Sequence, residues 1–333
     1  MRAYELQNAV GIENLKLVER DVPRAGLGEV VVRLKAASLN YRDLAIVSYM
    51  GGNMPFVPLS DGAGEVVEVG AGVSRVKVGD RVAPSFFPHW LSGEPTPAGL
   101  AALGSPYDGC ASDYLKVSAE GVSIAPKNLS DEEVACLPCA ALTAWRGLFV
   151  EGKLKAGDTV LVQGTGGVSI FALQFAKAAG ARVIVTSSSD EKLERAKTLG
   201  ADEFINYKKT PDWSGEARKL TGGRGVDHVI EVGGADTFPQ SIAAIRLGGH
   251  IAVIGLLTGM TKDLNVAAIF SQNARISGVT VGSRAMVDDM FRAIEQNDIH
   301  PVIDQRFSLE EFPEALKLMQ GASHFGKIVL NIG

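Results

Sequence analysis

The chain of 333 residues is 46% hydrophobic and 21% charged, so it is long enough for two domains with sizeable buried cores. Its formal net charge of −5 at pH 7 gives no overall attraction for phosphate backbones, which argues against a nucleic-acid partner. No apolar run reaches the roughly 18 to 20 residues of a membrane span, and the first residues show no targeting pattern, so we expect no membrane association and a cytoplasmic location.

The three cysteines, Cys110, Cys136 and Cys139, are too few and too unevenly spaced for a disulfide framework, which fits a reducing compartment. Cys136 and Cys139 form a C-x-x-C pair, but no second pair completes a zinc ribbon. We therefore expect these two side chains to pack near the start of a helix.

The N-terminal part of the chain carries the pattern of a β-rich unit. Between Glu29 and Val82, short Val-rich and alternating runs are separated by glycine turns. Residues 84–109 are dense in Pro and Gly, which predicts a long surface loop. Four apolar residues of this loop either line the entrance to an apolar site or pack on the domain surface: Phe86, Phe87, Trp90 and Leu91.

A different pattern begins near Ser130, which Glu133 follows three residues later, as in a capping box at a helix start. Beyond it, strand and helix patterns alternate, which predicts a parallel sheet covered by helices on both faces. The strands are expected at residues 159–164, 182–187, 203–207, 226–233, 250–255 and 274–282. Two amphipathic helices, 287–298 and 309–320, and a last strand, 326–332, are expected to return to the β-rich unit.

The sequence GTGGVS, from Gly164 to Ser169, lies where a strand pattern gives way to a helix pattern, the context in which G-x-G-x-x-G indicates dinucleotide binding. Gly164 can form the tight turn, Gly166 lets the backbone approach a pyrophosphate, and the helix from about Gly167 offers free N–H groups to the anion. Ser169 replaces the third glycine, which governs the packing of helix on strand. A glycine turn without a ligand is the alternative.

The end of the second of these strands predicts the choice of coenzyme. An Asp or Glu there would bind the ribose 2′-OH of NAD(H), whereas this chain has Ser187, with Lys192 in the next helix. The competing acids, Asp190 and Glu191, are expected to serve the helix N-terminus through a capping box of Ser188 with Glu191. We therefore favour NADP(H) over NAD(H).

Over its whole length the chain resembles the medium-chain dehydrogenase/reductase superfamily. The resemblance rests on the motifs GAGEVVEVGAGVSRVKVGDRV, LPCAALTAW, AGDTVLVQGTGGVS, KLERAKTLGAD, GVDHVIEVGG and HFGKIVL. It implies the α/β class: a Rossmann domain with a doubly wound parallel sheet, residues 140–281, inserted in a GroES-like β-rich catalytic domain, residues 1–139 and 282–333. The active site would lie in the cleft between the two.

Alcohol dehydrogenases of this superfamily bind catalytic zinc through a Cys, the His of a G-H-E motif and a later Cys. Here Asn40 stands at the first position and LSD at residues 59–61 replaces G-H-E, so only Cys139 matches a ligand. His89 could contribute together with Asp61 and Cys139, although the sequence does not give their geometry, and a catalytic zinc needs about three protein ligands. The four-Cys lobe for structural zinc is also missing. We expect no zinc, and the motif NYRD at residues 40–43 is similar to the zinc-free branch of quinone oxidoreductases and enone reductases.

Without zinc, hydrogen-bond donors must polarise the carbonyl of a hydride acceptor. Asn40 offers an amide, and Tyr41 and Tyr49 offer phenols that could also supply a proton, although each tyrosine could instead be an ordinary edge or core aromatic. Arg42 and Asp43 are expected to pair and to order this segment.

With Gly164, Gly166, Gly167, Ser187 and Lys192, the resemblance implies further coenzyme contacts at Thr143, Val168, Tyr207, Val232, Gly233, Gly255, Leu256 and Lys327. No histidine has ligand spacing to another, so His228, His250, His300 and His324 are expected to be packing or surface residues.

The leading hypothesis is an NADPH-dependent oxidoreductase that transfers hydride, without a metal, to a quinone or an α,β-unsaturated carbonyl of small, apolar or aromatic character. A zinc-independent NAD(P)-dependent alcohol dehydrogenase or aldehyde reductase is a second hypothesis. A non-catalytic NADPH-binding structural or regulatory protein is a third. Because members of the superfamily usually pair through the edge of the Rossmann sheet, we expect a homodimer formed through residues 274–283.

Overall fold

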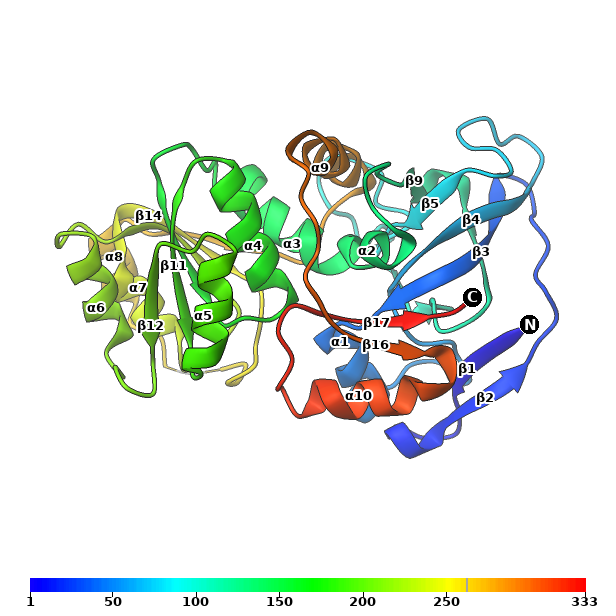
Figure 1. The fold of residues 1–333 in the computed structure, drawn as a ribbon, viewed down its shortest axis with the longest axis horizontal. Helices are drawn as coiled ribbons and strands as arrows, with labels where there is room; N and C mark the ends of the chain where they lie inside the picture. Colours follow the sequence, from blue (N-terminus) through cyan, green and yellow to red (C-terminus); the bar gives the residue numbers. More distant parts are fainter. Residues whose placement is uncertain (262) are drawn as a thin grey trace. The chain divides into compact units, whose positions relative to one another are not determined.

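The computed structural model describes residues 1–261 and 263–333 (Figure 1). The chain forms two compact units. Met1–Leu142 and Val281–Gly333 together form the first, here called the split unit, and Thr143–Thr280 forms the second, the inserted unit. The sequence places the boundaries after residues 139 and 281, three residues before and one residue after the observed ones.

In the described part of the split unit, one mixed sheet has the strand order β16-β17-β3-β4-β5-β9, and β8 also pairs with β3. A ribbon of β1 with β2 and a short pair of β6 with β7 complete the strands. The strands are β1 (Arg2–Leu6), β2 (Leu15–Glu19), β3 (Glu29–Ser38), β4 (Asp61–Val69), β5 (Arg81–Pro84), β6 (Ala102–Leu103), β7 (Pro106–Tyr107), β8 (Tyr114–Ser118), β9 (Val122–Ile124), β16 (Ile303–Ser308) and β17 (Lys327–Asn331).

The helical segments of the split unit are short except near the C-terminus. They are η1 (Ile12–Asn14), α1 (Tyr41–Ala45), η2 (Ile46–Met50), η3 (Ala119–Gly121), α2 (Asp131–Ala135), η4 (Leu137–Ala141), α9 (Arg284–Asn297), η6 (Leu309–Glu311) and α10 (Phe312–Gln320). The predicted capping box is confirmed at α2, where the Ser130 and Glu133 side chains bond each other's backbone N–H groups. Cys136 follows directly and is buried, as expected for a packing residue near a helix start.

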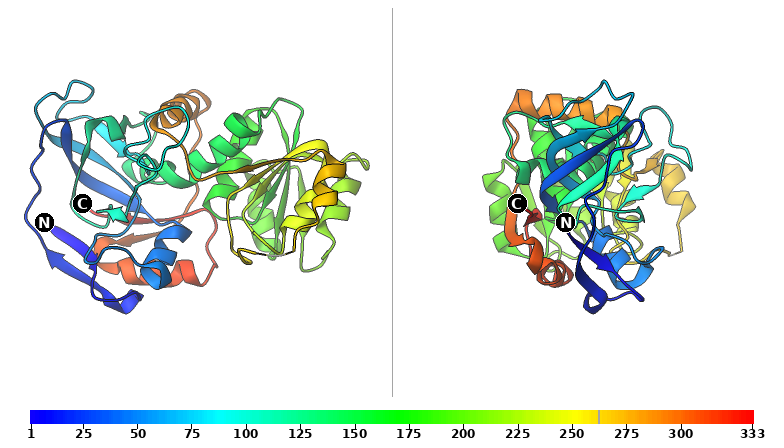
Figure 2. Two further views of the ribbon diagram at one scale, coloured as in Figure 1. Left: turned by 180° about the vertical axis from the view of Figure 1, so that it is seen from behind. Right: turned by 90° about the vertical axis from the view of Figure 1, so that its right-hand side faces the viewer.

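The C-terminal strand returns to the split unit, as predicted. β17 runs antiparallel to β3, with Val329 opposite Ser38, and Figure 2 shows this red C-terminal segment in the same unit as the blue N-terminal strands. Most residues of both strands are apolar and buried, and α10 adds Phe312 and Leu316 to the same core. This pairing brings Lys327 beside the residues that follow β3.

In the inserted unit the described strands form a six-stranded, wholly parallel sheet with the order β12-β11-β10-β13-β14-β15. The predicted α/β class and doubly wound sheet are therefore confirmed. The strands are β10 (Thr159–Gln163), β11 (Arg182–Ser187), β12 (Glu203–Asn206), β13 (Val226–Glu231), β14 (Ile245–Val253) and β15 (Arg275–Gly278).

Helices cover both faces of this sheet. Helices α4 and α5 contact β10, β11 and β12, while α6, α7 and α8 lie on the opposite face (Figure 1). The helical segments are α3 (Leu142–Trp145), which begins at the unit boundary, η5 (Arg146–Glu151), α4 (Gly167–Ala178), α5 (Asp190–Thr198), α6 (Trp213–Leu220), α7 (Phe238–Ala244) and α8 (Val266–Gln272). The strand order reverses at β10, and ligands bind at such switch points beyond the carboxyl ends of the strands.

The segment 84–109 differs from the predicted surface loop. Phe86, Phe87 and Trp90 are buried, with ring centroids 4.6 Å apart for the first two and 6.1 Å apart for the last two. The Arg42 guanidinium lies over the Phe86 ring, 5.0 Å from its centroid. These rings pack against one another in the split unit, and whether they also line the entrance to a substrate site stays a prediction.

Over residues 1–261 and 263–333, no helix combines the length and the apolar character required to cross a bilayer.

Candidate active site

The glycine turn of the inserted unit has the predicted geometry. It follows β10 and starts α4, and Gly164 has a φ of +71°, which favours glycine. Gly166 is the N-cap residue, and no side chain caps the helix, so the first N–H groups of α4 lack side-chain acceptors. A Cβ added at either glycine would meet no protein atom within 4 Å. Open space beside free N–H groups at a helix N-terminus suits an anionic ligand.

Ser169 does what was expected of the third glycine position. Its side chain is buried, and its hydroxyl donates to the carbonyl oxygen of Gln163 at 2.7 Å. This bond joins the first turn of α4 to the end of β10, so the serine fixes helix-on-strand packing without reaching the open space.

Ser187 ends β11, as predicted, and is buried, with its hydroxyl accepting from the backbone N–H of Ser189 at 3.2 Å. The predicted capping box of Ser188 with Glu191 is wrong: α5 begins one residue later, and Ser189 is the residue that accepts from the backbone N–H of Lys192. Both serines satisfy the local preference for a cap, and the backbone conformation decides between them.

The acid that could compete for a ribose is already bonded. Asp190 accepts from the side-chain amide of Asn206 at 2.6 Å and pairs with the Lys209 ammonium. These hydrogen bonds lower the pKa of Asp190, so it stays an anion committed to its two partners.

The other coenzyme positions expected in this unit lie at the same edge of the sheet. Because all strands are parallel, the residues after β12, β13 and β14 share the edge that carries the glycine turn. Tyr207 and Leu256 are 42% and 49% exposed there, and Val232, Gly233 and Gly255 follow the central strands. Gly255 must stay small, because a Cβ would lie 2.1 Å from the carbonyl oxygen of Val232. Thr143 is buried at the first position of the unit.

In the split unit, Lys327 lies in a buried polar cluster with Asn40, Asp43, Ser60 and Asp61. Its ammonium donates to the carbonyl oxygen of Leu39 and to Oδ1 of Asn40, both at 2.7 Å. An ammonium can only donate, so this bond fixes the orientation of the Asn40 amide.

A chain of donors runs from the lysine to a carboxylate. The Nδ2 atom of Asn40 donates to the Ser60 hydroxyl at 3.3 Å, and this hydroxyl donates to Oδ1 of Asp61 at 3.2 Å. The other carboxylate oxygen accepts from the backbone N–H of Cys139 at 3.0 Å. Both polar atoms of the Asn40 side chain thus bond residues of the cluster, which argues against the direct contact with substrate predicted for this amide.

Burial raises the pKa of Asp61 to about 6, against the opposing effect of the Lys327 ammonium. Burial also raises the pKa of Asp43, although Arg42 lowers it and both oxygens accept hydrogen bonds. The predicted ion pair of Arg42 with Asp43 is present, with an N–O distance of 3.3 Å. Because the Asp43 side chain is buried, this is not an exposed ion pair, which would add little stability.

The two tyrosines of this segment differ from the cluster in exposure. Tyr41, at the start of α1, is 52% exposed, and Tyr49, in η2, is 58% exposed. Burial of its ring edge and a hydrogen bond to Tyr41 raise the pKa of Tyr49, so its phenol keeps its proton at neutral pH. The pair presents adjacent phenol groups at the surface of the unit.

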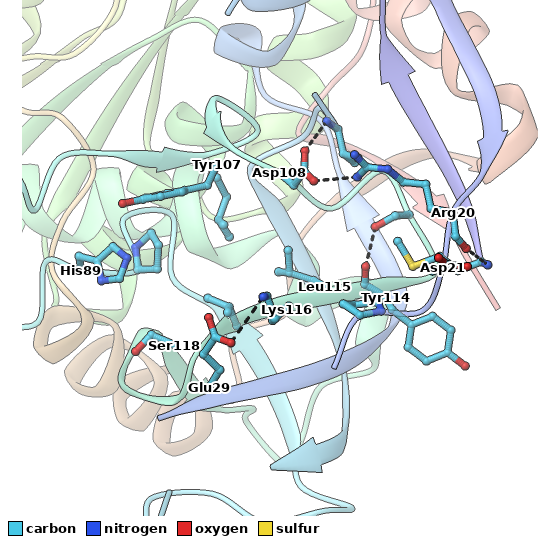
Figure 3. Close-up of a pocket in the computed structure, with 18 residues that line it drawn as sticks. Arg20, Asp21, Glu29, His89, Tyr107, Asp108, Tyr114, Leu115, Lys116 and Ser118 are labelled. Carbon is cyan, nitrogen blue, oxygen red and sulfur yellow. Dashed lines mark hydrogen bonds and ion pairs between the residues drawn. The ribbon is translucent and has the colours of Figure 1, made fainter. Parts of the chain in front are cut away.

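A groove of about 520 Å³ lies elsewhere on the split unit (Figure 3). Among its charged residues, Arg20 pairs with Asp108 at 2.7 Å and Lys116 with Glu29 at 3.6 Å. His89 lines it, with its ring against that of Tyr107. None of the residues predicted to bind coenzyme or substrate lines this groove, so we assign it no part in the reaction.

One residue at the sheet edge was missed by sequence analysis. Glu231 ends β13 with its carboxylate fully buried and bonded to the turn that follows. An acidic residue directly after the apolar residues Val229 and Ile230, at the end of a predicted strand, was the available signal.

Comparison with known proteins identifies the family. The description "Alcohol dehydrogenase GroES-like domain" matches residues 26–127, and "Zinc-binding dehydrogenase" matches residues 167–296. A zinc-type alcohol dehydrogenase-like protein of Schizosaccharomyces pombe is 51% identical, over 97% of this chain and 96% of its own length. The chain belongs to the zinc-type alcohol dehydrogenase-like family of medium-chain dehydrogenases/reductases, which are NAD(P)-dependent oxidoreductases.

Solved structures agree with this membership. A structure described as an NAD-dependent alcohol dehydrogenase has a TM-score of 0.92 and 37% identity, with both chains covered completely. A mycobacterial quinone oxidoreductase has a TM-score of 0.83 and 26% identity, and a mycobacterial complex with NADPH has 0.84 and 27%, each with full coverage of both chains.

The family name implies zinc, but the donors of this chain do not fit a catalytic zinc ion. The positions that the family resemblance assigns to zinc ligands hold Asn40, Ser60 and Cys139, and the first two are bonded to each other. In the described ranges, 1–261 and 263–333, no three His, Cys, Asp or Glu side chains are grouped to hold a metal.

Proposed function

We propose that this chain uses NADPH to reduce a quinone or an α,β-unsaturated carbonyl compound without a metal ion. The observation that carries the proposal is the buried cluster in which the Lys327 ammonium bonds Asn40, the residue that the family resemblance places at a zinc-ligand position. In this cluster a lysine ammonium supplies the positive charge. This supports a reaction in which only neutral hydrogen-bond donors contact the substrate.

Conjugated acceptors suit such a site. When bound, the reduced nicotinamide supplies a hydride, which adds to the β-carbon of the acceptor and moves an electron pair onto the carbonyl oxygen. One or two neutral donors can stabilise the resulting enolate, and a proton from a donor completes the reduction. An alcohol substrate would instead pass through an alkoxide, which a metal ion stabilises better than a phenol or an amide.

We assign the donor role to Tyr41 and Tyr49, and a positioning role to Asn40. The phenols are adjacent and exposed, whereas the Asn40 amide is bonded to Ser60 and Lys327. Two N–H groups of the Lys327 ammonium donate to Leu39 and Asn40. The third N–H group is left for the coenzyme, which the family resemblance places beside this lysine.

Replacing Tyr41 or Tyr49 by phenylalanine should lower kcat for an enone by roughly 10- to 100-fold, because a general acid contributes about 10²- to 10⁴-fold and the remaining phenol substitutes in part. The KM for NADPH should stay within about twofold. Steady-state kinetics of both variants and of the double variant give the answer, with Tyr107→Phe, 40% exposed in the same unit, as the control. Unchanged kcat in the double variant would remove the tyrosines from the mechanism.

For the coenzyme we propose NADP(H). Ser187 offers no carboxylate to a ribose, and Asp190 is bonded to Asn206 and Lys209. A 2′-phosphate would meet less repulsion here than beside an acid at the strand end.

The variant Ser187→Asp should shift the ratio of kcat/KM for NADPH over NADH toward NADH by about tenfold or more, because the new carboxylate repels a 2′-phosphate and accepts from a 2′-OH. Kinetics with both coenzymes measure the ratio. Asp190→Asn is the matched control and should leave the ratio unchanged, since its carboxylate already bonds other residues. An unaltered ratio in Ser187→Asp would refute the assignment.

The names of the relatives keep an alternative open. Alcohol or aldehyde chemistry is favoured by the NAD-dependent alcohol dehydrogenase with 37% identity, and a non-catalytic coenzyme binder would need none of the donors. A screen of NADPH oxidation with quinones, enones, enoyl thioesters and aldehydes separates the three. We expect turnover with the conjugated acceptors; turnover with aldehydes alone supports the second hypothesis, and tight NADPH binding without turnover supports the third.

We also propose a homodimer through β15. This strand ends the hydrogen-bonding order of its sheet, and Ile276 on it is 39% exposed. Exposed apolar side chains precede it in sequence: Leu257, Met260, Leu264, Val266 and Phe270. A second copy would cover such an edge and its apolar surroundings. Light scattering at micromolar concentration should give twice the monomer mass, and a monomer would contradict the proposal.

A further inference from the structure

A buried carboxylate holds the turn that follows β13. Glu231 has no exposed surface, and no Lys, Arg or His among the residues the structure describes lies within ion-pair distance of it. The carboxyl group is surrounded by hydrogen-bond donors, and its burial is costly unless its acceptor positions are used.

Both oxygens of Glu231 accept from several donors. Oε1 accepts from the backbone N–H groups of Gly233 and Gly234, at 2.8 and 3.0 Å, and from the Thr237 hydroxyl at 2.6 Å. Oε2 accepts from the side-chain amide of Gln163 at 2.7 Å and from the Ser241 hydroxyl. Five donors saturate a carboxylate.

Gln163 holds the same turn from β10. Its Oε1 atom accepts from the backbone N–H groups of Val232 and Gly233, at 3.3 and 3.1 Å. Backbone N–H groups can only donate, so the amide orientation is fixed and its NH₂ group must face Glu231. The side chains of Gln163 and Glu231 therefore fix three consecutive N–H groups of residues 232–234.

We propose that Glu231 and Gln163 are positioning residues for the coenzyme. They hold Val232 and Gly233 in the conformation that contacts it, and they keep the N–H groups of this turn turned inward. The inference rests on the proposed coenzyme site at the carboxyl edge of the sheet. It predicts that one of positions 163 and 231 must carry an amide and the other a carboxylate, so that the NH₂ group of the amide faces a carboxylate oxygen. Either position can carry the carboxylate.

The variant Glu231→Gln places an NH₂ group against either the Gln163 amide or the backbone donors, so at least one buried donor loses its acceptor. We expect the Kd and KM for NADPH to rise about tenfold or more, with kcat at saturating NADPH within about twofold of wild type. The experiment is NADPH fluorescence titration and steady-state kinetics of the full chain, with Glu203→Gln in β12 as the matched control, since Glu203 pairs with Arg182 at the opposite end of its strand.

The exchanged double variant Gln163→Glu with Glu231→Gln restores an amide that faces a carboxylate. A glutamate at 163 accepts from the Val232 and Gly233 N–H groups and from the new amide, whose oxygen accepts from the turn. We expect this variant to bind NADPH within about threefold of wild type, whereas Gln163→Glu alone, with two facing carboxylates, should bind at least as poorly as Glu231→Gln. A purely structural role for Glu231 would lower the unfolding temperature without moving the Kd of the folded variant.

Several outcomes overturn the inference. A folded Glu231→Gln variant with wild-type NADPH affinity contradicts it, and so does a double variant that folds without regaining affinity. If Glu231→Gln does not fold, Thr237→Val removes one donor and should weaken NADPH binding about threefold, while Thr237→Ser keeps the hydroxyl and the affinity; equal affinities also contradict the inference. Failure of the wild-type chain to bind NADPH would instead refute the proposed function itself.

Discussion

Replacing Gly166 with valine should weaken NADPH binding at least about 30-fold, roughly 2 kcal/mol of binding free energy, while the unfolding temperature changes little. Gly166 has extended backbone angles that any residue adopts, and a Cβ there meets no protein atom within 4 Å. The added side chain therefore fills only the space that the pyrophosphate would occupy. Isothermal titration with NADPH and a thermal unfolding scan measure the two quantities on one sample.

Gly321→Val is the matched control for this variant. Gly321 follows α10 in the split unit with helical angles, and its nearest atoms are at ordinary contact distances of 3.4 and 3.7 Å. Its NADPH affinity should equal that of wild type. Wild-type affinity in Gly166→Val would show that the glycine turn holds no phosphate.

Replacing Lys327 with methionine should reduce the free energy of unfolding at pH 7 by about 2 to 5 kcal/mol, because it leaves the Leu39 carbonyl oxygen and Oδ1 of Asn40 buried without their donor and removes the positive charge that opposes the effect of burial on Asp61. The loss should depend on pH. Burial raises the pKa of Asp61 to about 6, so the folded state binds this proton more tightly than the unfolded chain does. The stability from this group is present below its ordinary pKa of 3.8 and is lost as the pH rises through about 6.

Removal of the ammonium raises the pKa of Asp61 further. The loss in free energy of unfolding of Lys327→Met should therefore be largest above pH 7 and shrink toward pH 4. Urea unfolding without coenzyme at several pH values measures it. Lys317→Met is the control, because Lys317 forms only an exposed pair with Glu314 at 3.9 Å. The double variant with Asp61→Asn should recover much of the loss at pH 7. A deficit that grows as the pH falls would contradict this account of the cluster.

The sheet of the inserted unit could be predicted because its strands are local apolar runs, each with its own turn signals. The strands at 159–163 and 182–187 and the glycine turn between β10 and α4 all follow from neighbouring residues. The α5 cap was wrong by one residue, because Ser188 and Ser189 have the same local preference.

Contacts between distant segments could not be predicted in the same way. Lys327 and Asn40 are 287 positions apart, and the register of β17 against β3 brings them together. The buried Phe86 ring lies under the Arg42 guanidinium, and the buried Glu231 carboxylate accepts from donors on β10 and α7. A sequence pattern shows which residue types are present, whereas these partners depend on the completed fold.

The central claim, hydride transfer to a conjugated carbonyl without a metal ion, is tested most directly by one measurement: NADPH oxidation with an enone by the purified chain after exhaustive chelation, with zinc determined on the same sample. We predict full turnover with far less than one zinc per chain. Activity that disappears on chelation and returns with one equivalent of zinc would contradict it.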